Sequence, residues 1–118
     1  MYGLPPNTQL DFLKGKTLLQ ACFGANDLIL NFTENISISI FSAVGVGLKG
    51  SNIERHSRFE EVSRELLRLL NRVVAEVHWT PEGSVTLIFD EGSAVHIYDD
   101  STGYESYTIT GPSGLLVV

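Results

Sequence analysis

Residues 30–41 (LNFTENISISIF) and residues 87–98 (LIFDEGSAVHIY) repeat one pattern at an interval of 57 positions. In each copy, apolar residues occupy every second position on both sides of a short polar break. Such alternation is typical of β-strands with one buried face, and a break of turn-forming residues joins two such strands in a hairpin. The repeat therefore predicts a fold built from two similar β-hairpins.

Each hairpin is predicted to have a loop of three residues, 33–35 in the first copy and 90–92 in the second. The last loop residues are Asn35 and Gly92, the residue types that best tolerate the left-handed backbone conformation used in such loops. This loop length sets the register of the paired strands. On the shared apolar face it predicts the pairs Phe32 with Ile36, Leu30 with Ile38, Leu28 with Ile40, Leu87 with Val95 and Val85 with Ile97.

The flanking sequences extend each hairpin to three strands. Residues 17–23 (TLLQACF) and 73–79 (VVAEVHW) each lead through a turn into a hairpin, so the internal repeats 17–41 and 73–98 are predicted to be antiparallel meanders. Residues 104–110 (YESYTIT) predict a further strand, and residues 115–118 a short last one. About seven or eight strands are expected in all.

Between the two repeats, the apolar period changes from 2 to about 3.6, which indicates a helix at about 57–71. Ser57 followed by Glu60 has the spacing of a capping box, so the helix is expected to begin there. Its apolar face would pack on the sheet. The predicted fold class is α+β, with antiparallel meanders from two hairpin repeats around one core and one principal helix packed across it.

Length and composition favour one folded domain spanning residues 1–118. The chain has 118 residues, of which 43% are hydrophobic, and no stretch reaches the roughly 20 consecutive apolar residues that a membrane span needs. The first residues lack the basic start and apolar run of a secretory signal, and Cys22 has no second cysteine to pair with. We expect a cytoplasmic protein with no membrane partner.

Charge is distributed unevenly along the chain. The net charge is −6, and from Val73 onward there are seven acidic residues and no Lys or Arg. This pattern predicts an acidic surface in the second half, which would repel nucleic acid and attract a basic protein. The alternative is that the acidic residues serve only solubility.

Aromatic and acidic side chains alternate at the end of the second repeat. Tyr and Trp contribute much of the binding energy of protein interfaces, and carboxylates would select a basic partner. His96 lies on the outer face of the second hairpin, across from Thr86, where the two repeats differ most. The candidate interface comprises Trp79, His96, Tyr98, Asp99, Asp100, Tyr104, Glu105 and Tyr107. The alternative for the aromatic residues is that their rings close the edge of the core.

No motif in the chain predicts catalysis, a cofactor or a metal. Residues 45–50 (GVGLKG) match GxGxxG, but the preceding strand belongs to an antiparallel hairpin and no helix is expected to open at the glycines, so a flexible connection is predicted. The three histidines lack metal-ligand spacing. Residues 99–105 (DDSTGYE) contain oxygen ligands, but their order does not fit an EF-hand loop, and a strand connection is expected.

Residues 83–109 (GSVTLIFDEGSAVHIYDDSTGYESYTI) resemble a group of small uncharacterised bacterial domains in which a hairpin precedes a Tyr-Glu-Ser-Tyr-like strand. The resemblance implies no catalytic residue. In charge and size, the chain is also similar to immunity proteins that neutralise basic toxins, which is an analogy with little specificity.

Three functional hypotheses follow. The first is a non-catalytic interaction protein whose acidic second half binds a basic partner. The second is a small-ligand or enzymatic domain with a cavity between the sheet halves, using His96 or Glu105. The third is a homo-oligomer that joins exposed sheet edges.

Overall fold

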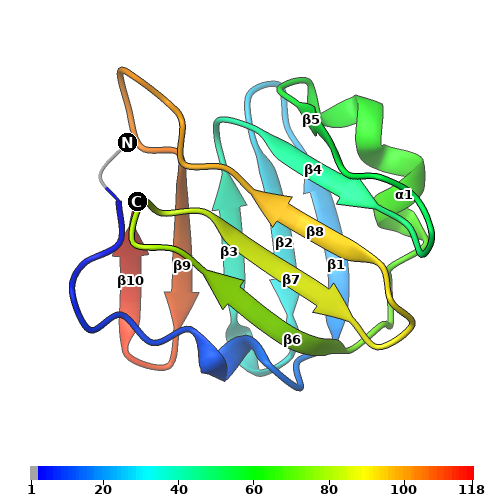
Figure 1. Ribbon diagram of the computed structural model, residues 1–118, viewed down its shortest axis with the longest axis horizontal. Coiled ribbons are helices and arrows are strands. Elements are labelled where there is room, and N and C mark those ends of the chain that lie inside the picture. Colours follow the sequence, from blue (N-terminus) through cyan, green and yellow to red (C-terminus); the bar gives the residue numbers. More distant parts are fainter. Residues whose placement is uncertain (1–2) are drawn as a thin grey trace.

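The computed structural model describes residues 3–118 and contains two antiparallel sheets of five strands each, stacked face to face (Figure 1). The first sheet has the order β1-β2-β3-β9-β10 and the second β5-β4-β8-β7-β6. The strands of the first sheet are β1 (Leu18–Phe23), β2 (Leu28–Phe32), β3 (Ser37–Ile40), β9 (Tyr107–Gly111) and β10 (Gly114–Val117). Those of the second are β4 (Val44–Gly47), β5 (Glu54–His56), β6 (Val74–Trp79), β7 (Val85–Phe89) and β8 (Ala94–Ile97).

The two predicted meanders are confirmed as β1-β2-β3 and β6-β7-β8, one in each sheet. Their strands pair in the predicted register, with Leu30 opposite Ile38 and Leu87 opposite Val95. In the first loop both Glu34 and Asn35 have positive φ, and Gly92 has φ 101° in the second. Turn chemistry and alternation therefore determined both hairpins, as expected from local sequence alone.

Each meander is completed by a hairpin from the other half of the chain. After β3, the chain crosses to the second sheet, where β4 pairs with β8 and β5 extends the edge. After β8, it crosses back to the first sheet, where β9 pairs with β3 and β10 extends that edge. The crossovers run side by side and bond reciprocally, since Phe41 N–H donates to the Ser106 carbonyl and Tyr98 N–H to that of Ala43.

The repeat also includes the segments that precede the meanders. Gly15 N–H donates to the Val74 carbonyl, and Asn71 N–H, at the equivalent position, donates to that of Leu18. Gly15 and Asn71 both have positive φ, and a bridge between Thr17 and Val73 joins the two repeats. The approximate two-fold symmetry therefore extends through residues 10–16 and 66–72, which precede the two meanders.

The helix is shorter than the range 57–71. It begins as a 3-10 turn, η3 (Phe59–Val62), and continues as α1 (Ser63–Leu67). The predicted capping box is wrong, because the residue before the helix is Arg58 and no side chain caps this end; Ser63 Oγ instead donates to the Glu60 carbonyl. Phe59, Val62, Leu66 and Leu69 are buried, so the expected apolar face packs into the core.

The Gly-rich stretch after β3 is not a flexible connection. Residues 44–47 form β4, an inner strand that is buried along its length, and residues 54–56 form the edge strand β5. A Cβ on Gly45 would lie 2.5 Å from Ile53 Cγ2 and 3.1 Å from the Tyr98 hydroxyl, so only glycine lets these side chains lie across the strand. With these two strands the total is ten, more than the seven or eight expected.

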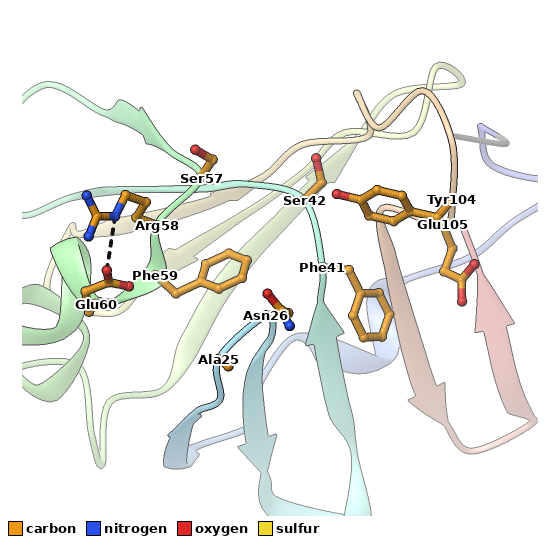
Figure 2. Close-up of a pocket in the computed structure, with 10 residues that line it drawn as sticks. All are labelled: Ala25, Asn26, Phe41, Ser42, Ser57, Arg58, Phe59, Glu60, Tyr104 and Glu105. Atoms are coloured by element: carbon orange, nitrogen blue, oxygen red, sulfur yellow. Dashed lines mark hydrogen bonds and ion pairs between the residues drawn. The ribbon is translucent and has the colours of Figure 1, made fainter.

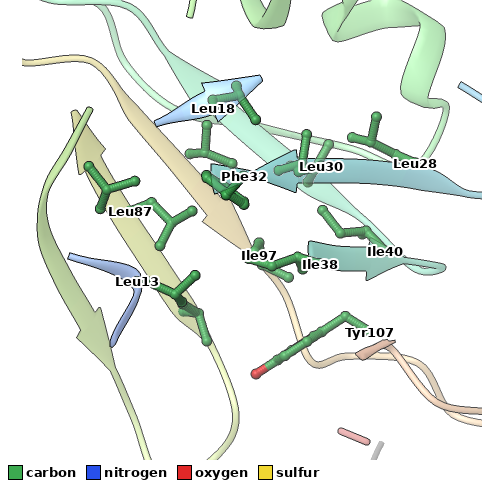
Figure 3. Packing of buried hydrophobic residues seen from close by; sticks show 14 of the residues in the cluster. Leu13, Leu18, Leu28, Leu30, Phe32, Ile38, Ile40, Leu87, Ile97 and Tyr107 are labelled. Atoms are coloured by element: carbon green, nitrogen blue, oxygen red, sulfur yellow. The ribbon is translucent and has the colours of Figure 1, made fainter. Parts of the chain in front are cut away.

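An apolar core fills the space between the sheets (Figure 3). The inward residues of both repeats meet there, together with Leu10 and Leu13 from the N-terminal segment, which includes the 3-10 turn η1 (Asp11–Leu13). Within the described residues, no helix is long and apolar enough to span a membrane.

Candidate interaction site

The eight candidate residues do not lie together on one surface. Tyr107 is fully buried between the sheets, where its hydroxyl donates to the Gly83 carbonyl and burial raises its pKa. It therefore closes the core, as the alternative interpretation of the aromatic residues holds, and cannot contribute to a surface. Trp79 is half-buried at the end of β6, packed against the core and beside residues 4–8 of the N-terminal segment.

His96 and Tyr98 lie on the outer face of the second sheet. His96 lies opposite Thr86 as predicted, and the Thr86 hydroxyl is 2.6 Å from His96 Nδ1. The two rings meet edge to face, with centroids 4.5 Å apart and an interplanar angle of 71°. Burial lowers the pKa of His96 below its ordinary value, because desolvation disfavours the charged imidazolium.

Arg55 on β5 contacts both the Tyr98 ring and Asp100, which lies on the crossover between β8 and β9. Its guanidinium lies 5.7 Å from the centroid of the Tyr98 ring, and its Nε donates to Asp100 at 2.8 Å. Ser42 Oγ donates to the other Asp100 oxygen at 2.8 Å. The hydrogen bond from Arg55 is the main reason that the pKa of Asp100 lies below its usual value. Arg55 was not among the candidate residues, because the strand that carries it was not predicted.

Asp99 is directed inward along the same crossover. It accepts hydrogen bonds from the buried Ser106 hydroxyl and from Gly3 N–H, both at 2.8 Å. Asp99 and Asp100 both form contacts within the chain, and β4 and β5 bring Arg55 and Lys49 of the first half alongside the second half. The expectation of an acidic surface in the second half stays a prediction.

Tyr104 and Glu105 lie elsewhere, at a groove of about 640 Å³ at one end of the sandwich (Figure 2). Its walls come from both crossovers, from the segment that enters the helix and from the β1–β2 turn. The lining residues are Ala25, Asn26, Phe41, Ser42, Ser57, Arg58, Phe59, Glu60, Tyr104 and Glu105. His96 is not among them, so the structure does not bring His96 and Glu105 into one cavity.

The groove has an aromatic middle and charged ends. Phe41, Phe59 and Tyr104 contribute rings, with the Tyr104 hydroxyl turned toward Ser42 (Figure 2). At one end Arg58 Nε donates to Glu60 at 3.2 Å. At the other end Glu105 is half-buried and forms no ion pair with any residue in the described range 3–118. Periodicity could not predict this groove, since its residues come from four separate segments.

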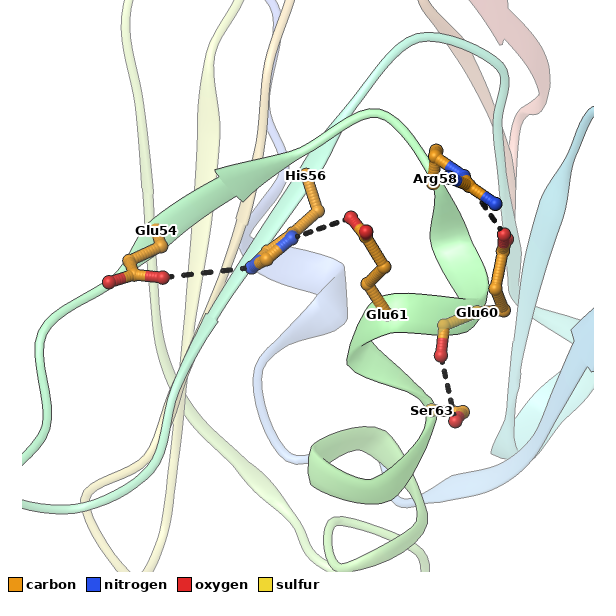
Figure 4. Close-up of polar contacts among 6 residues, drawn as sticks. All are labelled: Glu54, His56, Arg58, Glu60, Glu61 and Ser63. Carbon is orange, nitrogen blue, oxygen red and sulfur yellow. Dashed lines mark hydrogen bonds and ion pairs between the residues drawn. The ribbon is translucent and has the colours of Figure 1, made fainter.

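A second polar cluster lies beside the helix (Figure 4). His56 Nδ1 is 3.1 Å from Glu61 Oε1, and His56 Nε2 is 4.0 Å from Glu54 Oε2. Glu65 lines the same small hollow of about 220 Å³, and one of its carboxylate oxygens is buried and has no hydrogen-bond partner among residues 3–118. No group of three or more His, Cys, Asp or Glu within residues 3–118 is arranged to hold a metal ion.

Comparison with known proteins gives one match. A family model covers residues 10–118, nearly the whole chain, and its description is "Family of unknown function (DUF6188)". No curated protein and no solved structure matches the chain. The family model supports the expectation of an uncharacterised family, and the likeness to immunity proteins stays a prediction.

Proposed function

The chain belongs to DUF6188, a family of unknown function, so we infer its role from its own surface: we propose that it is a non-catalytic interaction protein whose groove binds a basic segment of a partner protein. The observation that carries the proposal is the groove itself, whose lining combines three aromatic rings in the middle with the carboxylate of Glu105 at one end. Such a site fits the side chain of Lys or Arg, with its apolar stem on the rings and its charge at the carboxylate.

The walls of the groove are held in place by hydrogen bonds within the chain. Phe41 N–H and Ser42 N–H both donate to the Ser106 carbonyl, which ties the two crossovers together. The Ser106 hydroxyl donates a hydrogen bond to Asp99, and the Ser42 hydroxyl donates one to Asp100. A site whose walls are already ordered loses less conformational entropy on binding, and this favours its affinity for a partner.

The charges around the groove support a basic rather than an acidic partner. Arg58, the basic residue of the lining, is already paired with Glu60, whereas Glu105 has no ion pair in the described part of the chain. The net charge of −6 adds long-range attraction for a basic protein. Asp100 contributes little to this attraction, because Arg55 neutralises it.

The cavity hypothesis gains less support. The space between the sheets is filled with apolar side chains, and the groove that does exist contains Glu105 without His96. A role in binding therefore has more support than a role in catalysis.

The test is capture of partners by crosslinking from a native lysate, followed by identification of the crosslinked residues. Wild type is compared with Glu105→Lys, with Tyr104→Ala and with the matched control Glu82→Lys, which makes the same charge change at an exposed turn away from the groove. We expect both groove variants to lose a stoichiometric partner that wild type and Glu82→Lys retain.

A titration with a short Lys- and Arg-containing peptide, followed by NMR, gives an independent result. Shift changes should centre on Phe41, Phe59 and Tyr104 and should be absent in Glu105→Lys. Equal loss of binding in Glu105→Lys and Glu82→Lys would show a response to net charge alone and would contradict the proposal.

A further inference from the structure

The edge strand β10 is exposed and uncharged. It reads Gly114-Leu115-Leu116-Val117, and the side chains of Leu115 and Val117 are 66% and 41% exposed. Hydrogen bonding at Val118 sets the alternation of the ladder between β9 and β10, because Val118 and Tyr107 exchange both of their backbone hydrogen bonds. Because such pairs alternate along an antiparallel ladder, Leu116 also bonds to β9, and the N–H and C=O groups of Leu115 and Val117 point away from it.

The other three sheet edges carry features that block pairing. β5 has only three residues, Glu54, Arg55 and His56, and two or three of these can be charged. β1 and β6 each contain a bulge, at equivalent positions of the two repeats. Charges and bulges are the usual protection of an edge strand against pairing with another chain, and β10 has neither.

The outer face of the first sheet, which continues from β10, is also without charge. Its two rows run across all five strands: Cys22, Ile29, Ser39, Thr108 and Val117 in one, and Gln20, Asn31, Ser37, Thr110 and Leu115 in the other. On a chain with a net charge of −6, an uncharged side is where a second copy can approach with the least repulsion. Charge therefore favours the chain itself as the occupant of this edge.

The register of β10 fits a two-fold axis. We propose that β10 pairs with β10 of a second copy, antiparallel about an axis at Leu116, so that the two first sheets become one sheet of ten strands. Leu115 of each copy then bonds to Val117 of the other through backbone groups that have no partner among residues 3–118 of one copy. Their side chains meet on the outer face as apolar cross-strand pairs, which stabilise antiparallel sheets.

A groove beside β10 provides further apolar surface for the second copy. It has a volume of about 620 Å³ and lies between β9–β10 and the N-terminal segment, with Pro6, Phe12 and Leu116 among its lining residues. Leu116 of the second copy would be directed toward this inner side. Since pairing of a short edge buries little area, the dimer is expected to be weak and to dissociate on dilution, as interfaces below about 1,200 Å² generally do.

The test is analytical ultracentrifugation of the full chain over a concentration range up to about 1 mM, because weak dimers have dissociation constants in the micromolar to millimolar range. We expect reversible dimers for wild type and at least a tenfold weaker association for Val117→Pro, which removes a free N–H, and for Leu115→Glu. Gln20→Glu, on β1 of the same face, is the matched control and should dimerise like wild type. Circular dichroism confirms that each variant is folded.

Hydrogen exchange identifies the edge directly. Protection of the Leu115 and Val117 amides should rise with protein concentration, while that of Ala21 on β1 should not. A monomer at every concentration, a dimer that survives both β10 variants, or concentration-dependent protection at Ala21 would each overturn the proposal. Glu105→Lys should dimerise normally, so failure of the groove proposal and failure of this one are distinguishable.

Discussion

At the scale of single residues, acidic and aromatic side chains that sequence alone places on a surface hold the chain together. Asp99 binds Ser106 and Gly3, Asp100 binds Arg55, and Tyr107 binds the Gly83 carbonyl. The alternation of aromatic and acidic residues marked them as candidates for an interface, but it did not show in which direction their side chains point. Their partners are 24 to 96 positions away for Tyr107, Asp100 and the Asp99–Gly3 contact, so no local pattern could have identified them.

Replacing Tyr107 with Phe should destabilise the fold by about 0.5–1.5 kcal/mol, the usual contribution of one hydrogen bond. The variant keeps the ring in the core and leaves the buried Gly83 carbonyl without its donor. Chemical denaturation measures the free energy of unfolding. The control is Tyr98→Phe, where the ring stays beside Arg55 and little change is expected; equal effects of the two substitutions would contradict the assignment.

The pair formed by Arg55 and Asp100 should make stability depend on pH in one direction. The pKa of Asp100 is lower in the folded state than its ordinary value of 3.8, mainly through the hydrogen bond from Arg55. Its contribution is therefore fully present above that value and is lost as pH falls through the folded pKa. Both side chains are substantially exposed, so the contribution is at most about 1 kcal/mol.

The measurement is the free energy of unfolding of wild type and Asp100→Asn from pH 7 to pH 2. The difference between the two proteins should be constant near neutral pH and shrink below about pH 4, where an ordinary Asp becomes protonated. In an Arg55→Met background, most of this pH dependence should be gone. A difference that grows as pH falls would have the wrong sign for this pair.

At the scale of elements, the hairpins were predictable and the Gly-rich strand and the helix ends were not. Alternation and loop residues act locally, so β2, β3, β7 and β8 followed from the sequence. Residues 44–47 were missed because glycine has low strand propensity, and as β4 they pair with β8, which is about 50 residues later in the chain. The helical period continued to Leu70, but the chain turns after Leu67 and reaches positive φ at Asn71.

Adjacent residues of α1 allow a matched test of how the helix packs. Leu66 is fully buried, whereas the side chain of Leu67 is 57% exposed. Leu66→Ala should cost about 2–5 kcal/mol through lost burial and the cavity that remains, while Leu67→Ala should change stability by only about 0.5 kcal/mol. Thermal or chemical denaturation measures the loss of stability in each of the two variants. Similar losses would mean that the helix does not cover the core as described.

At the scale of the whole molecule, the two halves of the chain are interleaved. Sequence predicted two sheet halves around one core, which the structure confirms, but not that each sheet takes two strands from the other half. Pairing between β3 and β9, or between β4 and β8, depends on contacts across the two repeats, which a pattern within either repeat does not encode. The groove depends on the same crossovers, and for that reason it too was missed.

Interleaving predicts that the chain unfolds as one unit. Trp79 lies in the second sheet, so its fluorescence should report the same transition midpoint as far-UV circular dichroism, which reports both sheets. Separately produced fragments 1–70 and 71–118 should each be largely unfolded and should regain strand content when mixed. Two separate transitions, or a fragment folded by itself, would show that the halves are independent.

The same crossing of the chain determines what a ribosome must release before the protein can fold. The β1-β2-β3 meander emerges early, but β9, the strand that pairs with the second edge of β3, begins at Tyr107, 67 residues after Ile40. At elongation rates of about 5–20 residues per second, β3 would stay an open edge for roughly 3–13 s. Folding is therefore completed only after nearly the whole chain has left the ribosome. Until β9 pairs with β3, the apolar strands of the first meander are uncovered. In this interval the nascent chain is most prone to aggregation and most dependent on chaperones.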